Sequence, residues 1–290
     1  MTVYNLGSIN IDDVLRVPHL PAPGETIAAT DHHAGLGGKG ANHSVAAARA
    51  GARVVHLGAV GEDGGPWLSA LEGSGVDISH VVRLNGPTGR ADIWVDAAGE
   101  NSIVLLGGAN HAVPEDAVAA ALQEAAADDF LMLQNETNGQ VAAARTARDR
   151  GIRVIYSAAP FDADVAAQVM PFVSVLIVNA VEAAQLAAAL GREVGPEDVP
   201  VLVVTKGSEG AVWHDLRAGS EIAVVPPEVT PVDTTGAGDT FSGYLAAGLD
   251  AGMDPEGAMR RAVSAAALSV TRPGAADAVP TWEEVDAALP

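Results

Sequence analysis

Short apolar runs alternate with amphipathic stretches along most of the chain. This pattern predicts strands over residues 3–9, 54–60, 131–134, 152–156, 173–178 and 201–205, and helices over residues 41–49, 65–74, 139–150, 164–170 and 181–190. Residues 236–271 read as helical with a break near 252–255, and a last helix is expected over residues 281–289. Repeated strand–helix alternation predicts an α/β fold with a doubly wound, mostly parallel sheet.

Two segments depart from this alternation. Residues 14–33 carry three prolines and Gly24, which suits an excursion away from the main sheet. Residues 90–96 and 101–106 alternate between apolar and polar positions on either side of a turn, which predicts a β-hairpin. We therefore expect residues 1–290 to form one domain, with a small β lid inserted at residues 12–33 and 89–108.

Composition narrows the possible partners and the compartment. The 290 residues contain no cysteine and carry a formal charge of −21, which argues against nucleic acid or an anionic membrane as a partner. The first ten residues lack the pattern of a signal peptide, and about 18 apolar residues never run unbroken. We expect a soluble, cytoplasmic protein. Both of its lysines, Lys39 and Lys206, lie in glycine-rich turns.

A turn that opens a helix lies at residues 232–243, Val-Asp-Thr-Thr-Gly-Ala-Gly-Asp-Thr-Phe-Ser-Gly. Gly236 and Gly238 permit unusual backbone conformations, and the first amides of a helix lack intrahelical partners, so phosphate can bind there. Asp239 in the first turn is placed to take a proton from a hydroxyl that attacks this phosphate. The helix N-terminus favours its ionised form. The alternative is a tight connection in which Asp239 only matches the helix dipole.

A second glycine-rich run, Gly-Leu-Gly-Gly-Lys-Gly-Ala-Asn at residues 35–42, precedes an alanine-rich helix. It matches G-x-G-x-x-G, but a dinucleotide site needs a buried strand just upstream, and residues 29–34 are too polar for one. A P-loop is excluded because no Ser or Thr follows Lys39. A sugar fits better, since closely spaced glycines let backbone amides approach hydroxyls and Asn42 offers both a donor and an acceptor.

Two further constellations follow predicted strands. Asn179 and Glu182 open a helix, and their spacing is also that of an ordinary capping box. Residues 205–210, Thr-Lys-Gly-Ser-Glu-Gly, form a strand-to-turn run that could equally be a hairpin turn. The eight histidines have no spacing typical of a metal site, so we expect them to be structural or exposed.

Taken together, these motifs resemble the signatures of the ribokinase (PfkB) family of carbohydrate kinases. The resemblance rests on residues 37–42 (Gly-Gly-Lys-Gly-Ala-Asn), Asn179-x-x-Glu182, Thr205-Lys-Gly-x-x-Gly210 and residues 233–239 (Asp-Thr-Thr-Gly-Ala-Gly-Asp). Their order and spacing match, and the similarity extends from residue 7 to residue 274.

The resemblance implies an ATP-dependent kinase that phosphorylates a sugar hydroxyl, most simply O5 of ribose. Asp239 would be the general base, and the amides of Gly236, Ala237 and Gly238 would form the anion hole. Sugar contacts would come from Asn10, Asp12, Gly38, Lys39, Asn42, Glu136 and Asp239. Nucleotide contacts would come from Asn179, Thr205, Lys206, Gly207, Ser208, Glu209, Gly210 and Gly238. Glu182 would serve Mg²⁺, and Asp233, Thr235, Ser269, Arg272 and Gly274 would serve K⁺. The resemblance also implies a homodimer joined through the lid.

Several positions depart from the family pattern. Ala278 replaces a serine that closes the potassium site, and Ser157-Ala-Ala-Pro160 replaces Asn-Pro-Ala-Pro. Val263 and Lys206 differ from usual residues near the nucleotide, and Trp94 could narrow the sugar pocket.

Other functions are compatible with the same motifs. The acceptor could be deoxyribose, fructose, tagatose, inositol or a nucleoside such as adenosine. A sensor of sugar or nucleotide and a nicotinamide dehydrogenase are alternatives from other classes. The sensor would require damage at the base or the anion hole, and the sequence has none.

Overall fold

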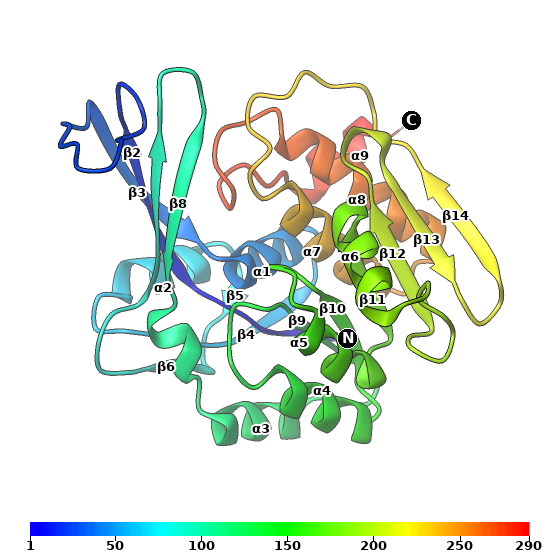
Figure 1. Ribbon diagram of the computed structural model, residues 1–290. Helices are drawn as coiled ribbons and strands as arrows, with labels where there is room; N and C mark the ends of the chain where they lie inside the picture. The colour runs from blue at the N-terminus through cyan, green and yellow to red at the C-terminus, as the bar shows by residue number, and fades with distance from the viewer. Residues whose placement is uncertain (290) are drawn as a thin grey trace.

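The computed structural model describes residues 1–289 and contains a ten-stranded main sheet (Figure 1). Its strands, in spatial order, are β14 (Ser220–Val224), β13 (Ala211–Asp215), β12 (Val201–Thr205), β11 (Val175–Asn179), β10 (Arg153–Ser157), β9 (Phe130–Leu133), β1 (Thr2–Leu6), β4 (Arg53–Val60) and β5 (Val76–Asp77), with β6 (Val81–Arg83) pairing β4. All neighbours from β12 to β5 run parallel, whereas β13 and β14 add an antiparallel extension. The predicted α/β fold with a mostly parallel sheet is confirmed.

Helices cover both faces of this sheet, which explains its long apolar strands. They are α1 (Lys39–Arg49), α2 (Gly65–Gly73), α3 (Glu115–Glu124), α4 (Gln140–Asp149), α5 (Ala163–Val169), α6 (Ala180–Leu190), α7 (Ala237–Asp250), α8 (Pro255–Ser269) and α9 (Trp282–Ala288), with short 3-10 turns at Gly108–Ala112, Met170–Phe172 and Gly207–Glu209. Alternate residues of each strand feed two cores. Val3 packs in the core that contains α1, α7 and α8, and its neighbour Tyr4 packs in the core that contains α3, α4 and α5.

A second, four-stranded sheet stands away from the main sheet, at the left of Figure 1. Its order is β3 (Asp31–Gly37), β2 (Asn10–Arg16), β7 (Gly89–Val95) and β8 (Asn101–Leu106). It includes the predicted hairpin and extends the first predicted segment to both sides, from Asn10 to Gly37. The assignment of residues 1–290 to one domain with this lid stays a prediction.

The register of the second sheet bears on the expected role of Trp94 at the sugar pocket. Asp12 on β2 lies opposite Ala91 on β7, so these two side chains share one face of the sheet. Trp94 is three positions beyond Ala91 and therefore points to the opposite face, because successive residues of a strand alternate. Trp94 therefore cannot narrow the sugar pocket from the face that carries Asp12.

The sequence pattern also missed complete elements. Helix α3 and strands β13 and β14 were not predicted, although the turn between β12 and β13 was recognised as a possible hairpin. Within residues 1–289, no helix is long and apolar enough to cross a membrane.

Candidate active site

The carboxyl ends of the parallel strands place the predicted site residues along one edge of the main sheet. Asn179 ends β11 directly beside Thr205 at the end of β12. Gln134 and Glu136 follow β9, and the turn at Gly7 and Ser8 follows β1. Helices α1 and α7 pack against each other and against β1, so their first turns reach the same edge. Ligands of open α/β sheets usually bind at such an edge.

The glycine run between β3 and α1 folds tightly against the β1–β2 connection. Gly38 caps α1 at φ 90°, a conformation that favours glycine. A Cβ at Gly37 would lie 2.0 Å from the Asp12 carboxyl group, and one at Gly40 would lie 2.4 Å from Cα of Gly7. Gly40 is required because the backbone of Gly7 approaches it too closely for any side chain, and a side chain at Gly37 would displace the Asp12 carboxylate.

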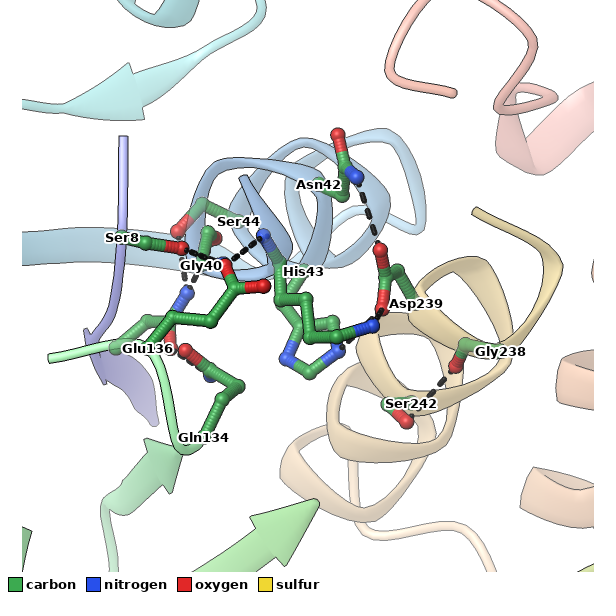
Figure 2. Close-up of polar contacts among 12 residues, drawn as sticks. Ser8, Gly40, Asn42, His43, Ser44, Gln134, Glu136, Gly238, Asp239 and Ser242 are labelled. Atoms are coloured by element: carbon green, nitrogen blue, oxygen red, sulfur yellow. Dashed lines mark hydrogen bonds and ion pairs between the residues drawn. The ribbon is translucent and has the colours of Figure 1, made fainter. Parts of the chain in front are cut away.

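Asp239 lies in the first turn of α7 and faces α1 (Figure 2). Its Oδ2 accepts a 2.9 Å hydrogen bond from Nδ2 of Asn42, while Oδ1 lies 3.7 Å from Nζ of Lys39 and 3.4 Å from Nε2 of His43. Burial acts to raise the pKa of the Asp239 carboxyl, but Lys39, His43 and Asn42 outweigh it and hold this pKa well below its usual range. Asp239 is therefore ionised at neutral pH, with 11% of its side chain exposed.

The N-terminus of α7 carries no side-chain cap. Gly236 occupies the N-cap position at φ 73°, where a Cβ would lie 2.9 Å from Cβ of Ala275. The amide of Ala237 donates to the carbonyl of Thr234 over a long 3.3 Å. Gly238 is exposed, and a Cβ built on it would meet no heavy atom within 4 Å. The first turn is thus open to a ligand, as an anion site requires.

Two more carboxylates lie near Asp239. Oε2 of Glu136 accepts hydrogen bonds from the Ser8 hydroxyl at 2.5 Å and from the Lys39 amide at 3.0 Å, so it fixes the glycine turn. Burial, aided by the charges of Glu136 and Asp239, raises the pKa of Asp12 to about 7. Lys39 is the cation among these acids, and the charge of Asp239 raises its pKa despite burial. Such a concentration of acids suits a ligand rich in hydroxyl groups.

The structure adds three residues that sequence reasoning missed. Asn110 binds Oδ1 of Asn10 at 2.7 Å and the amide of Ile9 at 2.9 Å, so it orients Asn10. Ser8 bridges Glu136 and the amide of Gly40. His43 was expected to be structural or exposed, yet its fully buried ring contacts Asp239. The position of His43 directly after Asn42, at the start of α1, was the signal available for it.

Helix α6 begins with a complete capping box. The Asn179 side chain accepts from the Glu182 amide at 2.9 Å, and Oε2 of Glu182 accepts from the Asn179 amide at 2.8 Å. Residues 206–209 are exposed in the turn from β12 to β13, with Gly207 at φ 58° and Gly210 at φ 90°. The capping interpretation of Asn179 and Glu182 is thus correct, and it leaves Oε1 of Glu182 outside the box.

The predicted cation residues gather beside the N-terminus of α7. Oδ1 of Asp233 accepts from the Thr235 amide and Oδ2 accepts from the Gly274 amide, both at 2.9 Å, which joins the two loops. Ala278 is buried at the base of the second loop. Within residues 1–289, no group of three or more His, Cys, Asp or Glu side chains has the arrangement of a metal site.

Comparison with known proteins identifies the family. Residues 2–282 match the model of the pfkB family carbohydrate kinases. The chain belongs to this family. As a pfkB-family member it is 34% identical over 301 residues to the ribokinase of Haemophilus influenzae, covering 98% of this chain and 96% of the relative. It is 30% identical over 299 residues to a deoxyribokinase of Salmonella typhi, covering 98% and 97% respectively.

This chain also shares its fold with a solved ribokinase structure. The Arabidopsis thaliana ribokinase complexed with ribose and ATP superposes with a TM-score of 0.86 at 28% identity, covering 99% of this chain and 98% of that one. The predicted family and the predicted phosphotransferase activity on an alcohol group are therefore confirmed. The roles of individual pfkB-family site residues in this chain stay predictions.

Proposed function

We propose that this chain is a ribokinase that transfers the γ-phosphate of ATP to O5 of ribose. The observation that carries the proposal is the Asp239 carboxylate, ionised and fixed on the open N-terminus of α7, opposite the glycine turn of α1. The ribokinase relatives at about 34% identity support ribose as the acceptor, and the ribose and ATP complex of the Arabidopsis ribokinase supports the substrate pair.

Asp239 acts as the general base in this proposal. As ribose O5 forms its bond to the γ-phosphorus, the bond from that phosphorus to the β–γ bridging oxygen breaks, and the O5 proton passes to Asp239. The electron pair of the broken bond leaves with ADP. A base must start ionised, and the lowered pKa of Asp239 meets that condition. The open amides of Gly236, Ala237 and Gly238 stabilise the charge on the transferred group.

Ribose binds between the glycine turn and the second sheet. Glu136 keeps Oε1 available while Oε2 holds the turn, and Asn10 keeps its amide donors while Asn110 holds its oxygen. These groups, together with Asp12, Gly38, Lys39, Asn42 and Asp239, supply the donors and acceptors that a polyhydroxylated ring needs.

ATP lies over the carboxyl ends of β11 and β12. We assign its contacts to Asn179, to residues 205–210 and to Gly238. Glu182 fits a role toward Mg²⁺, since the capping box uses only its Oε2. When bound, Mg²⁺ neutralises phosphate charge.

A potassium ion fits beside the anion hole. Asp233 joins the loop of Thr235 to the loop of Gly274, so their carbonyl oxygens and those of Ser269 and Arg272 can supply the hard donors that such a cation prefers. When bound, K⁺ supplies positive charge next to the first turn of α7. Ala278 leaves this shell one side-chain oxygen short, which we expect to weaken it.

The second sheet supplies the lid and the contact of a cytoplasmic homodimer. Strand β8 lies at its edge and exposes four successive apolar residues, Ile103, Val104, Leu105 and Leu106, by 52–58%. An apolar edge strand of this kind is stabilised when a second copy covers it. Sedimentation at micromolar concentration should give a dimer, and a monomer would contradict a homodimer joined through the second sheet.

A coupled ADP-release assay tests the activity. The acceptors should include ribose, deoxyribose, fructose, tagatose, inositol and adenosine, each with ATP. We expect the highest kcat/KM with ribose, and phosphorus–proton coupling at C5 in the NMR spectrum of the product. Deoxyribose is the second candidate, because of the deoxyribokinase relative. A higher kcat/KM with another acceptor would replace ribose, and ATP binding without turnover on any acceptor would favour a sensor.

A further inference from the structure

His43 is a buried histidine that the proposed reaction does not use. Its side chain is 0% exposed, and it lies on α1 with Nε2 3.4 Å from Oδ1 of Asp239. Within the described residues 1–289, neither ring nitrogen has a hydrogen-bond partner. Figure 2 shows His43 and Asn42 reaching from α1 toward the same carboxylate. Because a buried polar ring without partners is costly, its presence against the base calls for an explanation.

The packing of α1 on α7 holds the His43 backbone in place. Gly243 lies one helical turn after Asp239, on the same side of α7. A Cβ at Gly243 would lie 2.5 Å from Cβ of Ala46 and 2.6 Å from the carbonyl oxygen of His43, so the two helices touch there. This close approach fixes the His43 backbone relative to α7, and the fully buried ring lies against the Asp239 carboxylate.

The contact geometry distinguishes the two carboxylate oxygens. Asn42 donates to Oδ2 at 2.9 Å, whereas His43 and Lys39 approach Oδ1 at 3.4 and 3.7 Å. A charge-assisted N–H···O⁻ bond is usually about 2.7–2.9 Å long, so the histidine contact is extended. Hydrogen bonds of catalytic groups are often long without substrate and shorten when it binds.

We infer that His43 is a positioning residue for the base, donating its Nε2–H to Oδ1 of Asp239 and fixing the plane of the carboxylate when the sugar is bound. Asn42 and His43 then hold one oxygen each, and both come from the helix whose N-terminal turn binds the sugar. Helix α1 thereby positions both the Asp239 carboxylate and the sugar hydroxyl from which Asp239 takes the proton. This inference rests on the proposed function, since it presumes that Asp239 takes the proton.

A pair of substitutions separates positioning from packing. His43→Leu keeps an apolar body of similar size but removes the donor, and His43→Gln restores an amide donor. We expect His43→Leu to lower kcat about 10- to 100-fold, as misplacement of a catalytic group does, with KM values for ribose and ATP within about threefold. His43→Gln should recover kcat to within about fivefold of the parent. The Tm of His43→Leu should stay near that of the parent, because the ring that is removed makes no hydrogen bond in the unliganded protein and Asp239 keeps its contacts with Asn42 and Lys39.

His56 provides the matched control. It is also fully buried, but Nδ1 pairs with Ser44 Oγ at 2.8 Å and Nε2 with the Gly7 carbonyl at 3.1 Å. His56→Leu removes both of these hydrogen bonds from the core and should lower Tm, as the loss of a structural histidine does. If His43→Leu behaves like His56→Leu, with Tm and kcat falling together, or if its kcat stays within threefold of the parent, the positioning role is overturned.

A spectroscopic readout keeps the inference separate from the activity. With ¹⁵N-labelled histidine, the His43 resonances can be assigned by their loss in His43→Gln. We expect the Nε2–H tautomer in the parent, and a shift of the Nε2 resonance in Asp239→Asn. The Nδ1–H tautomer would overturn the inference even if the parent phosphorylates ribose. Conversely, absence of turnover with the expected tautomer and shift would refute the proposed function and leave the contact between His43 and Asp239 established.

Discussion

Two helix N-termini point toward the proposed substrates, and they are built in opposite ways. Helix α6 begins with Asn179 and Glu182, which satisfy each other's amides in a capping box. Helix α7 begins with Gly236, which offers no side-chain cap, and its exposed Gly238 has free space around it. A capped terminus is stable without a ligand, whereas an uncapped one keeps amide donors for an anion.

The contrast between the capped α6 N-terminus and the uncapped α7 N-terminus indicates that the two have different functions. Glycine at the start of α7 costs local stability but lets a phosphoryl group approach the backbone directly. The first-turn acid differs as well: Glu182 is used by the cap, whereas Asp239 faces Asn42, Lys39 and His43 across the helix interface. We therefore place the chemistry at α7 and give α6 an accessory role toward the nucleotide.

Removal of the base should have the largest effect. In Asp239→Asn, kcat should fall by roughly 10²- to 10⁴-fold, the usual contribution of a positioned acid–base group. Binding of ribose and ATP, measured by calorimetry, should change little because the amide keeps the size and most hydrogen bonds of the carboxylate. A kcat within threefold of the parent would rule out Asp239 as the base.

Obstructing access to the amides in the first turn of α7 should have the next largest effect on kcat. A Cβ at Gly238 meets no protein atom within 4 Å, so Gly238→Ala should fold normally while its methyl group occupies space over the first turn of α7. We expect kcat to fall about 10²-fold, comparable to the loss of one oxyanion-hole donor. Gly73→Ala is the matched control, since Gly73 lies in α2 with equally open space. Equal activity of both variants would remove Gly238 from the anion hole.

Much of this fold follows from local sequence patterns. Buried parallel strands such as Phe130–Leu133 are continuous apolar runs, and the helices that follow them have clear starts, so the alternation of strands and helices could be recognised in the sequence. Strands β13 and β14 were missed because residues such as His214 and Glu221 interrupt the apolar pattern on an exposed edge. Helix α3 was missed because only its Val118, Ala121 and Leu122 face the core.

The site was predictable where backbone geometry requires glycine and less so where side chains meet across helices. Gly38 and Gly236 adopt positive φ angles, and such positions are conspicuous in a sequence. The contact of His43 with Asp239 joins residues 196 positions apart through the packing of α1 on α7, for which no local pattern exists. Asn110 supports Asn10 from 100 residues away for the same reason.

The proposed potassium site in the loops beside the α7 N-terminus should have a smaller effect on activity. Activity in buffer free of sodium and potassium should rise several-fold with potassium chloride, and less with choline chloride at equal ionic strength. Ala278→Ser adds an oxygen at the buried base of the second loop and should shift half-activation to lower potassium. Equal responses to the two salts would mean that no potassium site operates here. A potassium response without a shift in Ala278→Ser would show that position 278 is not a ligand.

The α6 N-terminus should give the smallest effect, and two variants separate its capping from its proposed nucleotide role. Glu182→Gln preserves the capping box, because glutamine at this position also reaches back to the N-cap amide, but it removes the charge. We expect an unchanged Tm, a several-fold higher Mg²⁺ concentration for half-maximal activity, and a kcat at saturating Mg²⁺ within about threefold of the parent. Asn179→Ala breaks the box and should cost about 1 kcal/mol of stability, with a higher KM for ATP. If Glu182→Gln keeps the parental Mg²⁺ dependence and Asn179→Ala changes stability but not KM, then α6 contributes a cap alone, and the contrast with α7 becomes complete.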